Sequence, residues 1–166
     1  ESRRKLSKRK DPESNAEFYL EKGYPIKALF VYLYTLINSN FEEWYLQNKD
    51  KSLDDFEMTF DAMAKSGPLY DIEKLNNISS EMIYDTPQER NIENLLAWAN
   101  EYNKHDYEIL NSDIDFVKKI LSTQGPNSRE RRKDLKTYSD FMDVFGFLYD
   151  DYFQNMPLDE LNAFKE

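Results

Sequence analysis

The amino-acid sequence predicts an all-α protein, a compact multi-helix bundle of six to eight helices around a long buried central helix. Apolar residues recur at spacings of three and four along most of the chain, and no segment shows the sustained alternation expected of a β-strand. In addition, the stretch from Ala28 to Phe41 holds fourteen residues without a charge, in a chain of which 33% is charged. Such a segment needs neighbours on several sides.

The central helix is predicted from Pro25 to about Asn48. Proline suits the first helical turn, where its missing N–H is not needed. A membrane span is excluded by length, because about 18 or more apolar residues are expected for one. We therefore expect a core helix in which Phe30 and Leu33 are buried. Its inward residues are Ile26, Leu29, Phe30, Leu33, Ile37, Phe41 and Trp44.

The other helices are predicted from capping residues followed by apolar stripes. They are expected at Ser14–Lys22, Leu53–Lys65, Leu69–Tyr84 (one helix or two short pieces), Pro87–Asn103, Ser112–Leu121 and Lys133–Phe153, with a last turn or two from Pro157 to Phe164. Ser14, Ser52, Thr86 and Ser112 are the expected caps. The helix that ends at Phe153 is expected to pack on the central helix.

The domain organisation follows from length and composition. The 166 residues fit one domain. Residues 1–13 are expected to form a flexible basic tail, because they hold one apolar residue among many charges. Residues 14–166 then form a single helical domain, in which residues 128–166 supply C-terminal helices packed on residues 14–122.

The charge is unevenly distributed. The net charge is −10, yet residues 1–10 and 129–136 are strongly basic, so the remainder of the chain carries −18. A surface of that charge disfavours general binding of nucleic acid or of an anionic membrane, and it leaves nucleic acid only the basic tail or residues 129–133. A protein partner is the expectation, since aromatic residues, 15% here, also build interfaces. The candidate partner-binding residues are Arg129, Arg131, Arg132 and Lys133, which are expected to contact a partner or the protein's own acidic surface.

The residue inventory excludes several chemistries. Cysteine is absent, which rules out disulfides and thiolate metal sites and is compatible with a cytoplasmic location. A single histidine rules out a histidine-rich zinc site. The four glycines lie too far apart for a phosphate-cradling loop. Neighbouring carboxylates could bind magnesium, but helix capping explains several of them, so neither a metal nor another cofactor is expected.

His105, expected at the fading end of a helix, invites a sharper hypothesis. The segment from Asn100 to Tyr107, together with the earlier segment from Ala16 to Leu29, resembles the helical bundles called HEPN domains over residues 14–122. The resemblance implies a metal-free ribonuclease site, usually completed across a dimer, in which an Arg and a His stand four to six residues apart. Here no arginine lies at that spacing, the nearest upstream being Arg90. The resemblance therefore implies a degenerate site and a binding scaffold.

Three functions follow from these observations. The first is a non-enzymatic interaction protein: a regulator, an immunity or antitoxin-type protein, or an adaptor, with no catalytic residue. The second is an acidic nucleic-acid mimic that inhibits a DNA-binding protein. The third is a HEPN-type ribonuclease that uses His105, and the same resemblance allows a dimer. In the first two, His105 is only a helix-end residue whose positive form the C-terminal dipole favours.

Overall fold

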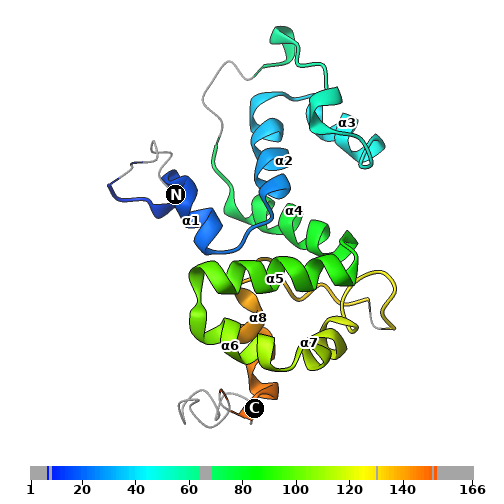
Figure 1. Cartoon of the computed structure of the whole chain (residues 1–166). Coiled ribbons are helices and arrows are strands. Elements are labelled where there is room, and N and C mark those ends of the chain that lie inside the picture. Colours follow the sequence, from blue (N-terminus) through cyan, green and yellow to red (C-terminus); the bar gives the residue numbers. More distant parts are fainter. Residues whose placement is uncertain (1–6, 8, 64–68, 130, 151, 153–166) are drawn as a thin grey trace, which may run out of the picture.

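The structure, a computed structural model, confirms the all-α fold (Figure 1). It describes residue 7 and residues 9–63, 69–129, 131–150 and 152. Residues 1–6 and 8 of the predicted basic tail lie outside the described residues. The predicted turn from Pro157 to Phe164 also lies outside them. The α-helices are α1 (Ala16–Glu21), α2 (Ile26–Ile37), α3 (Phe41–Gln47), α4 (Ile72–Asp85), α5 (Gln88–Tyr102), α6 (Lys104–Ser112), α7 (Ile114–Leu121) and α8 (Asp140–Phe145). Four short 3₁₀ helices are η1 (Pro12–Ser14), η2 (Leu53–Asp55), η3 (Phe60–Ala62) and η4 (Gly146–Leu148).

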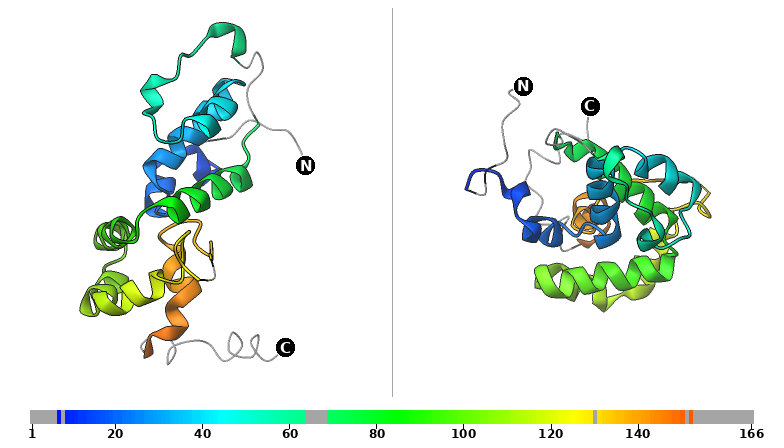
Figure 2. Two further views of the ribbon diagram at one scale, coloured as in Figure 1. Left: turned by 90° about the vertical axis from the view of Figure 1, so that its right-hand side faces the viewer. Right: turned by 90° about the horizontal axis from the view of Figure 1, so that it is seen from above.

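The helices form two groups (Figures 1 and 2). In one group α2 packs on α4 and is followed by α3, with α1 leading into it. In the other group α5 packs on α6 and α7, and α8 lies against them. The junction runs from the end of α4 into the start of α5.

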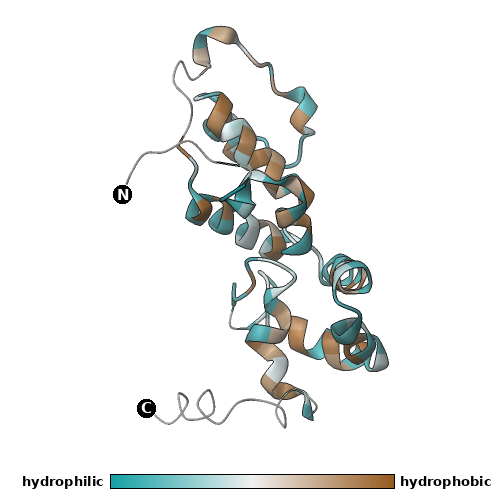
Figure 3. Ribbon diagram, turned by 90° about the vertical axis from the view of Figure 1, so that its left-hand side faces the viewer, coloured by the Kyte–Doolittle hydropathy of each residue, from teal (hydrophilic) through white to brown (hydrophobic). Residues whose placement is uncertain are grey.

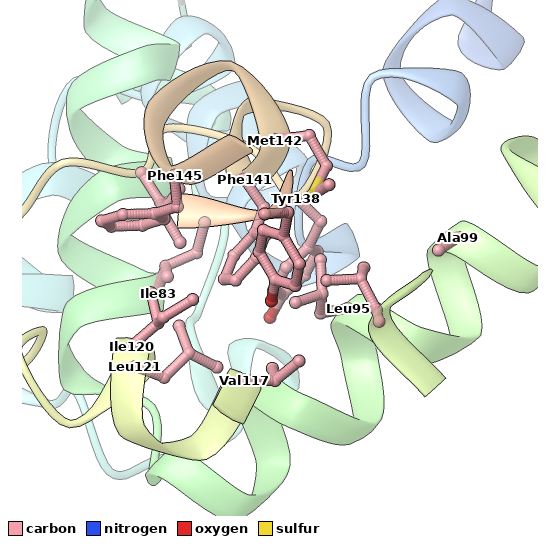
Figure 4. Close-up of a cluster of buried hydrophobic side chains, with 13 residues drawn as sticks. Ile83, Leu95, Ala99, Val117, Ile120, Leu121, Tyr138, Phe141, Met142 and Phe145 are labelled. Carbon is pink, nitrogen blue, oxygen red and sulfur yellow. The ribbon is translucent and has the colours of Figure 1, made fainter. Parts of the chain in front are cut away.

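The larger core, called here the α5–α8 cluster, lies within the second group (Figure 4). It combines the end of α4 with α5, α6, α7, α8 and the segment before α8. Its buried members are Ile83, Leu95, Ala99, Leu110, Val117, Ile120, Leu121, Leu135, Tyr138, Phe141, Met142, Phe145 and Tyr149. Most of these residues stand three or four apart within their helices, as expected for one buried face of each helix.

The smaller core, called here the α2–α4 cluster, is rich in tyrosine. Its buried members are Tyr24, Tyr32 and Leu75. The tyrosine hydroxyls are paired, since Tyr24 donates to Asn76 Oδ1 at 2.6 Å and Tyr32 accepts from the Asp71 N–H at 2.7 Å. Burial raises the pKa of Tyr24 to about 12. This cluster therefore joins α2 to the first turns of α4 by polar as well as apolar contacts.

The prediction of one long central helix is wrong, because the helix breaks between Ile37 and Phe41. Asn38 is buried, and its side chain accepts from the N–H of Asn40 at 3.0 Å and donates to the carbonyl of Thr59 at 3.2 Å. Asparagine side chains that bond the nearby backbone in this way compete with helical hydrogen bonds. The result is two separate helices, α2 and α3.

The predicted buried face is also wrong over most of α2, although Phe41, the predicted inward residue that begins α3, is buried. Phe30 and Leu33 are exposed, whereas Ala28, Val31 and Tyr32 are buried. Ala28 and Tyr32 each stand two residues from Phe30, which places them nearly opposite it, at about 100° per residue. An uncharged helix offers more than one apolar face, so periodicity alone did not identify the face that meets the core.

Two further helices are shorter than predicted. Leu53–Lys65 forms only η2 and η3 within its described residues, although the predicted cap at Ser52 is present and its hydroxyl accepts from the Asp54 N–H at 3.3 Å. The predicted Lys133–Phe153 helix begins only at Asp140, because the Asp140 carboxylate accepts from the N–H of Lys136 at 3.0 Å and of Thr137 at 2.8 Å. This helix packs in the α5–α8 cluster rather than on the central helix.

Candidate functional site

A groove of about 940 Å³ lies along the junction of the two helix groups. It is bounded by α2, α3, α4 and α5, and five aromatic rings are part of its wall. These rings belong to Tyr24, Tyr45, Trp98, Tyr102 and Tyr138. The groove thus offers flat apolar surfaces of the kind that stack on planar groups.

The base of the groove is held rigidly at Gly23. The indole N–H of Trp98 donates to the carbonyl of Glu21 at 2.9 Å, and the N–H of Tyr138 donates to the carbonyl of Gly23 at 3.0 Å. Gly23 has a φ of +71°, which favours glycine, and a Cβ there would lie 3.0 Å from Trp98 Cδ1. The turn after α1 is therefore locked onto α5 and onto the segment before α8.

The charges around the groove are balanced. Lys49 pairs with Asp85 at 3.5 Å, and Lys74 pairs at 2.8 Å with Glu42, which lines the groove. These pairs leave an almost neutral wall. The groove alone therefore suits a planar, weakly charged group better than a phosphate.

A second feature, called here the basic loop, comprises residues 118–136 and is described apart from residue 130. It begins in the last turn of α7 and runs to the segment before α8, with seven basic and two acidic residues. The basic residues are Lys118, Lys119, Arg129, Arg131, Arg132, Lys133 and Lys136. This is a cationic surface on a chain that is acidic overall outside this loop and the basic residues 1–10.

The backbone of the basic loop is fixed by its own bonds. The N–H of Gly125, whose φ is +86°, donates to the carbonyl of Arg132 at 3.2 Å, so the loop folds back on itself. The Ser128 hydroxyl donates to the carbonyl of Gly125 at 2.8 Å. The cations are consequently presented from an ordered backbone, which lowers the entropy cost of binding.

Arg132 and Lys133, among the four candidate partner-binding residues, contact carboxylates of the protein itself. Arg132 pairs with Asp134 at 2.6 Å, and Lys133 pairs with Glu81 of α4. Lys133 also lies 4.5 Å from the centre of the Tyr84 ring, and its hydrogen bond with Glu81 raises its pKa. The Arg132 pair is local to the loop, whereas the Lys133 pair joins the loop to α4.

The other two candidates, Arg129 and Arg131, are exposed. Arg131 has a φ of +49°, a conformation that is uncommon for residues other than glycine. The helix predicted from Lys133 to Phe153 would have placed these four residues at its start. None of them lies at a helix start, because α8 begins only at Asp140. That these residues bind a partner stays a prediction.

His105 lies at the start of α6 and not at the fading end of a helix. Its ring stacks on Tyr152, with centroids 5.9 Å apart and planes at 26°. The neighbouring buried Asp106 accepts hydrogen bonds from the Tyr152 hydroxyl and from the Asn103 side-chain amide. A positive charge on His105 would face the positive end of the helix dipole, contrary to the expected C-terminal position. The HEPN resemblance itself stays a prediction.

Metal binding and membrane insertion find no site in the described part of the chain. Within the described ranges, no group of three or more His, Asp or Glu side chains is placed to hold a metal ion. The described helices are each too short or too polar to cross a bilayer. The candidate site is therefore the groove together with the basic loop beside it.

Comparison with known proteins relates this chain to an enzyme. The glutamate–tRNA ligase of Acetivibrio thermocellus is 43% identical over 151 residues, which cover 91% of this chain and 28% of the ligase. The glutamate–tRNA ligase of Clostridium perfringens is 38% identical over 154 residues, and that of Sorangium cellulosum is 31% identical over 156 residues. This chain thus spans little more than a quarter of the length of these relatives. No family model matches it, and no solved structure does.

These similarities overturn the functional interpretation made from the sequence. The expected regulator, immunity protein or adaptor with a protein partner is wrong, because the relatives that match nearly the whole chain are ligases. The nucleic-acid mimic and the ribonuclease find no support among them either.

The sequence did contain a signal for this loop. Seven cations fall within the 19 residues from Lys118 to Lys136, a run that extends the four candidate residues in both directions. The groove had no comparable signal. Its aromatic wall combines residues that are distant in the sequence and that only the fold brings together.

Proposed function

We propose that this chain is a region of a glutamate–tRNA ligase and that it helps to hold the tRNA. The observation that carries the proposal is the 43% identity to the Acetivibrio thermocellus ligase across 91% of this chain. Because the chain spans only 28% of that relative, the activity of the whole ligase would depend on other regions as well.

The basic loop is the part of the described surface that fits a polyanion. Phosphate contacts supply much of the affinity of proteins for nucleic acids, and lysine and arginine make most of them. Lys118, Lys119, Arg129 and Arg131 are all exposed. Outside residues 1–10, which are also basic, the rest of the chain carries a large negative charge, so that part of the surface would repel phosphates.

The groove lies beside the loop, because Lys133 pairs with Glu81, a residue of the groove wall. Sequence-specific recognition of RNA usually involves unpaired bases that stack on aromatic rings. The rings of Tyr45 and Tyr102 line the groove. In this arrangement the loop would hold phosphates, and the groove would take a neighbouring unstacked base.

The test is a titration of the protein with tRNA specific for glutamate, repeated at several salt concentrations. The double variant Arg129→Glu/Arg131→Glu should weaken binding and lower the salt slope by about one for each phosphate that is no longer neutralised. The control is Lys51→Glu/Lys104→Glu, which changes the net charge equally at exposed sites outside the loop. Equal weakening in both variants would remove the loop from the proposal, and no binding by the parent protein would overturn the proposed function.

A further inference from the structure

One helix carries an apolar surface that the two cores do not use. Ile26, Phe30, Leu33 and Ile37 lie at spacings of four, three and four on α2, and each is exposed. Phe30 is 50% exposed and Leu33 is 47% exposed. These four residues, called here the apolar stripe, follow one side of α2 for about 16 Å, at about 1.5 Å per residue. Figure 3 shows the apolar colouring of this helix.

The stripe is separate from the other two sides of α2. Ala28 and Tyr32 are buried, Tyr32 within the α2–α4 cluster, and Lys27, Val31 and Thr35 line the groove. At about 100° per residue the stripe occupies the remaining sector. It therefore belongs neither to the core nor to the proposed RNA site, apart from Ile26 at its end, which also borders the groove.

The chemistry of the stripe indicates what kind of surface can pack against it. None of its four side chains carries a charge or a hydrogen-bond donor, so it has nothing with which to bind a phosphate or a base edge. A contiguous exposed apolar patch typically marks contact with another protein surface. This chain covers little more than a quarter of each relative, so a ligase that includes it has ample further polypeptide.

We infer that the apolar stripe of α2 packs against a part of the same ligase polypeptide that lies outside these 166 residues. The inference rests on the proposed function. The contact fixes the RNA-holding region against the rest of the enzyme through α2, while the groove side of the same helix stays open. The stripe thus forms an intramolecular contact between this region and another region of the ligase.

The test is photo-cross-linking in the full ligase polypeptide. Phe30 is replaced by the photoreactive analogue p-benzoylphenylalanine, and the cross-linked peptides are identified by mass spectrometry. The matched control places the analogue at Phe147 of η4, which is also 50% exposed. We expect Phe30 to yield peptides from outside residues 1–166, and we expect Leu33→Asp to reduce this yield roughly fivefold or more, because a carboxylate is costly to bury in an apolar contact.

Every other result overturns the inference. A cross-link to residues 1–166 of the same molecule would mean that the chain covers its own stripe. A cross-linked dimer would identify a second copy as the occupant, and a cross-link to tRNA would assign the stripe to the substrate. A yield no greater than that of Phe147 would leave the stripe in solvent. Because cross-linking does not require tRNA, its failure is distinguishable from failure of the tRNA titration.

Discussion

The two helix groups of this molecule use their apolar residues differently. In the α5–α8 cluster the large apolar side chains meet one another, and Phe141, Leu110 and Val117 are completely buried. In the first group the buried cluster is small, and α2 leaves four large apolar residues in solvent. Apolar burial therefore stabilises the second group mainly from within, whereas the first group leaves apolar surface available for contacts beyond itself.

The largest effect is expected in the α5–α8 cluster. Phe141→Ala should lower the free energy of unfolding by about 3 to 5 kcal/mol, because it removes a fully buried ring and leaves a cavity. Urea unfolding followed by circular dichroism measures this change. Phe147→Ala, at the exposed aromatic residue of η4, is the control and should change stability by less than about 1 kcal/mol. Similar losses in both variants would show that the second group does not hold the main core.

The junction between the groups gives the next largest effect. Gly23→Ala should lower the free energy of unfolding by about 2 kcal/mol, because φ is +71° and the added Cβ would lie 3.0 Å from Trp98 Cδ1 and from Tyr138 Cβ. Urea unfolding measures this loss. The fluorescence of Trp98 should change as well, since the substitution displaces its ring.

A second glycine provides the comparison for this substitution. Gly146→Ala adds a Cβ against the Tyr152 ring, without a positive φ, and should cost less than Gly23→Ala. If the two losses were equal, the conformation of Gly23 would not be what holds the groups together.

The apolar stripe predicts a small effect. Leu33→Ala should lower the stability of the 166-residue protein by less than about 1 kcal/mol, because about half of this side chain is already in solvent. Leu95→Ala, at a buried leucine of α5, is the matched control and should cost about 2 to 5 kcal/mol. Chemical denaturation of both variants gives the comparison. A large loss of unfolding free energy for Leu33→Ala would show that this face of α2 is buried in the core after all.

This contrast also shows how far the sequence could be interpreted. Helical spacing relates the buried residues of α5 and α7, such as Leu95 with Ala99 and Val117 with Ile120, and charged residues occupy the outer faces of these helices. In α2 nearly every position is uncharged, so the pattern could not distinguish the face toward the core from the face toward a partner. The choice of Phe30 and Leu33 as core residues was wrong for that reason.

Local side-chain bonds limited the rest of the prediction. The break at Asn38 depends on a hydrogen bond with Thr59, 21 residues away, and α8 starts late because the Asp140 side chain bonds the backbone N–H of Lys136 instead of leaving it to a helical bond. The same limit applied to the site. The seven basic residues between positions 118 and 136 can be recognised in the sequence. The aromatic residues of the groove come together only where the two helix groups meet, so the sequence alone could not predict them.

The smallest effect concerns a hydroxyl in the larger core. Tyr149 is buried, and its hydroxyl has no hydrogen-bond partner among the described residues. A buried polar group without a partner is removed from water and gains nothing in return. Tyr149→Phe should therefore leave the free energy of unfolding unchanged or raise it by up to about 1 kcal/mol near neutral pH. The control is Tyr152→Phe, which removes the hydroxyl that donates to the buried Asp106 and should destabilise the protein.

The pH dependence sharpens this last expectation. Burial raises the pKa of Tyr149 from 10.0 to about 12, with a smaller contribution from the negative charge of Asp113. Above about pH 10 the unfolded chain loses the Tyr149 proton while the folded protein keeps it, so alkaline conditions favour unfolding of the parent through this group until the pH approaches about 12. Phenylalanine has no proton to lose, so the stability of Tyr149→Phe relative to the parent should increase between about pH 8 and about pH 11. Urea unfolding of both proteins at these two pH values measures the difference. A constant difference would mean that the Tyr149 hydroxyl reaches solvent in the folded protein, and the larger core would then be less tightly closed at η4 than the structure shows.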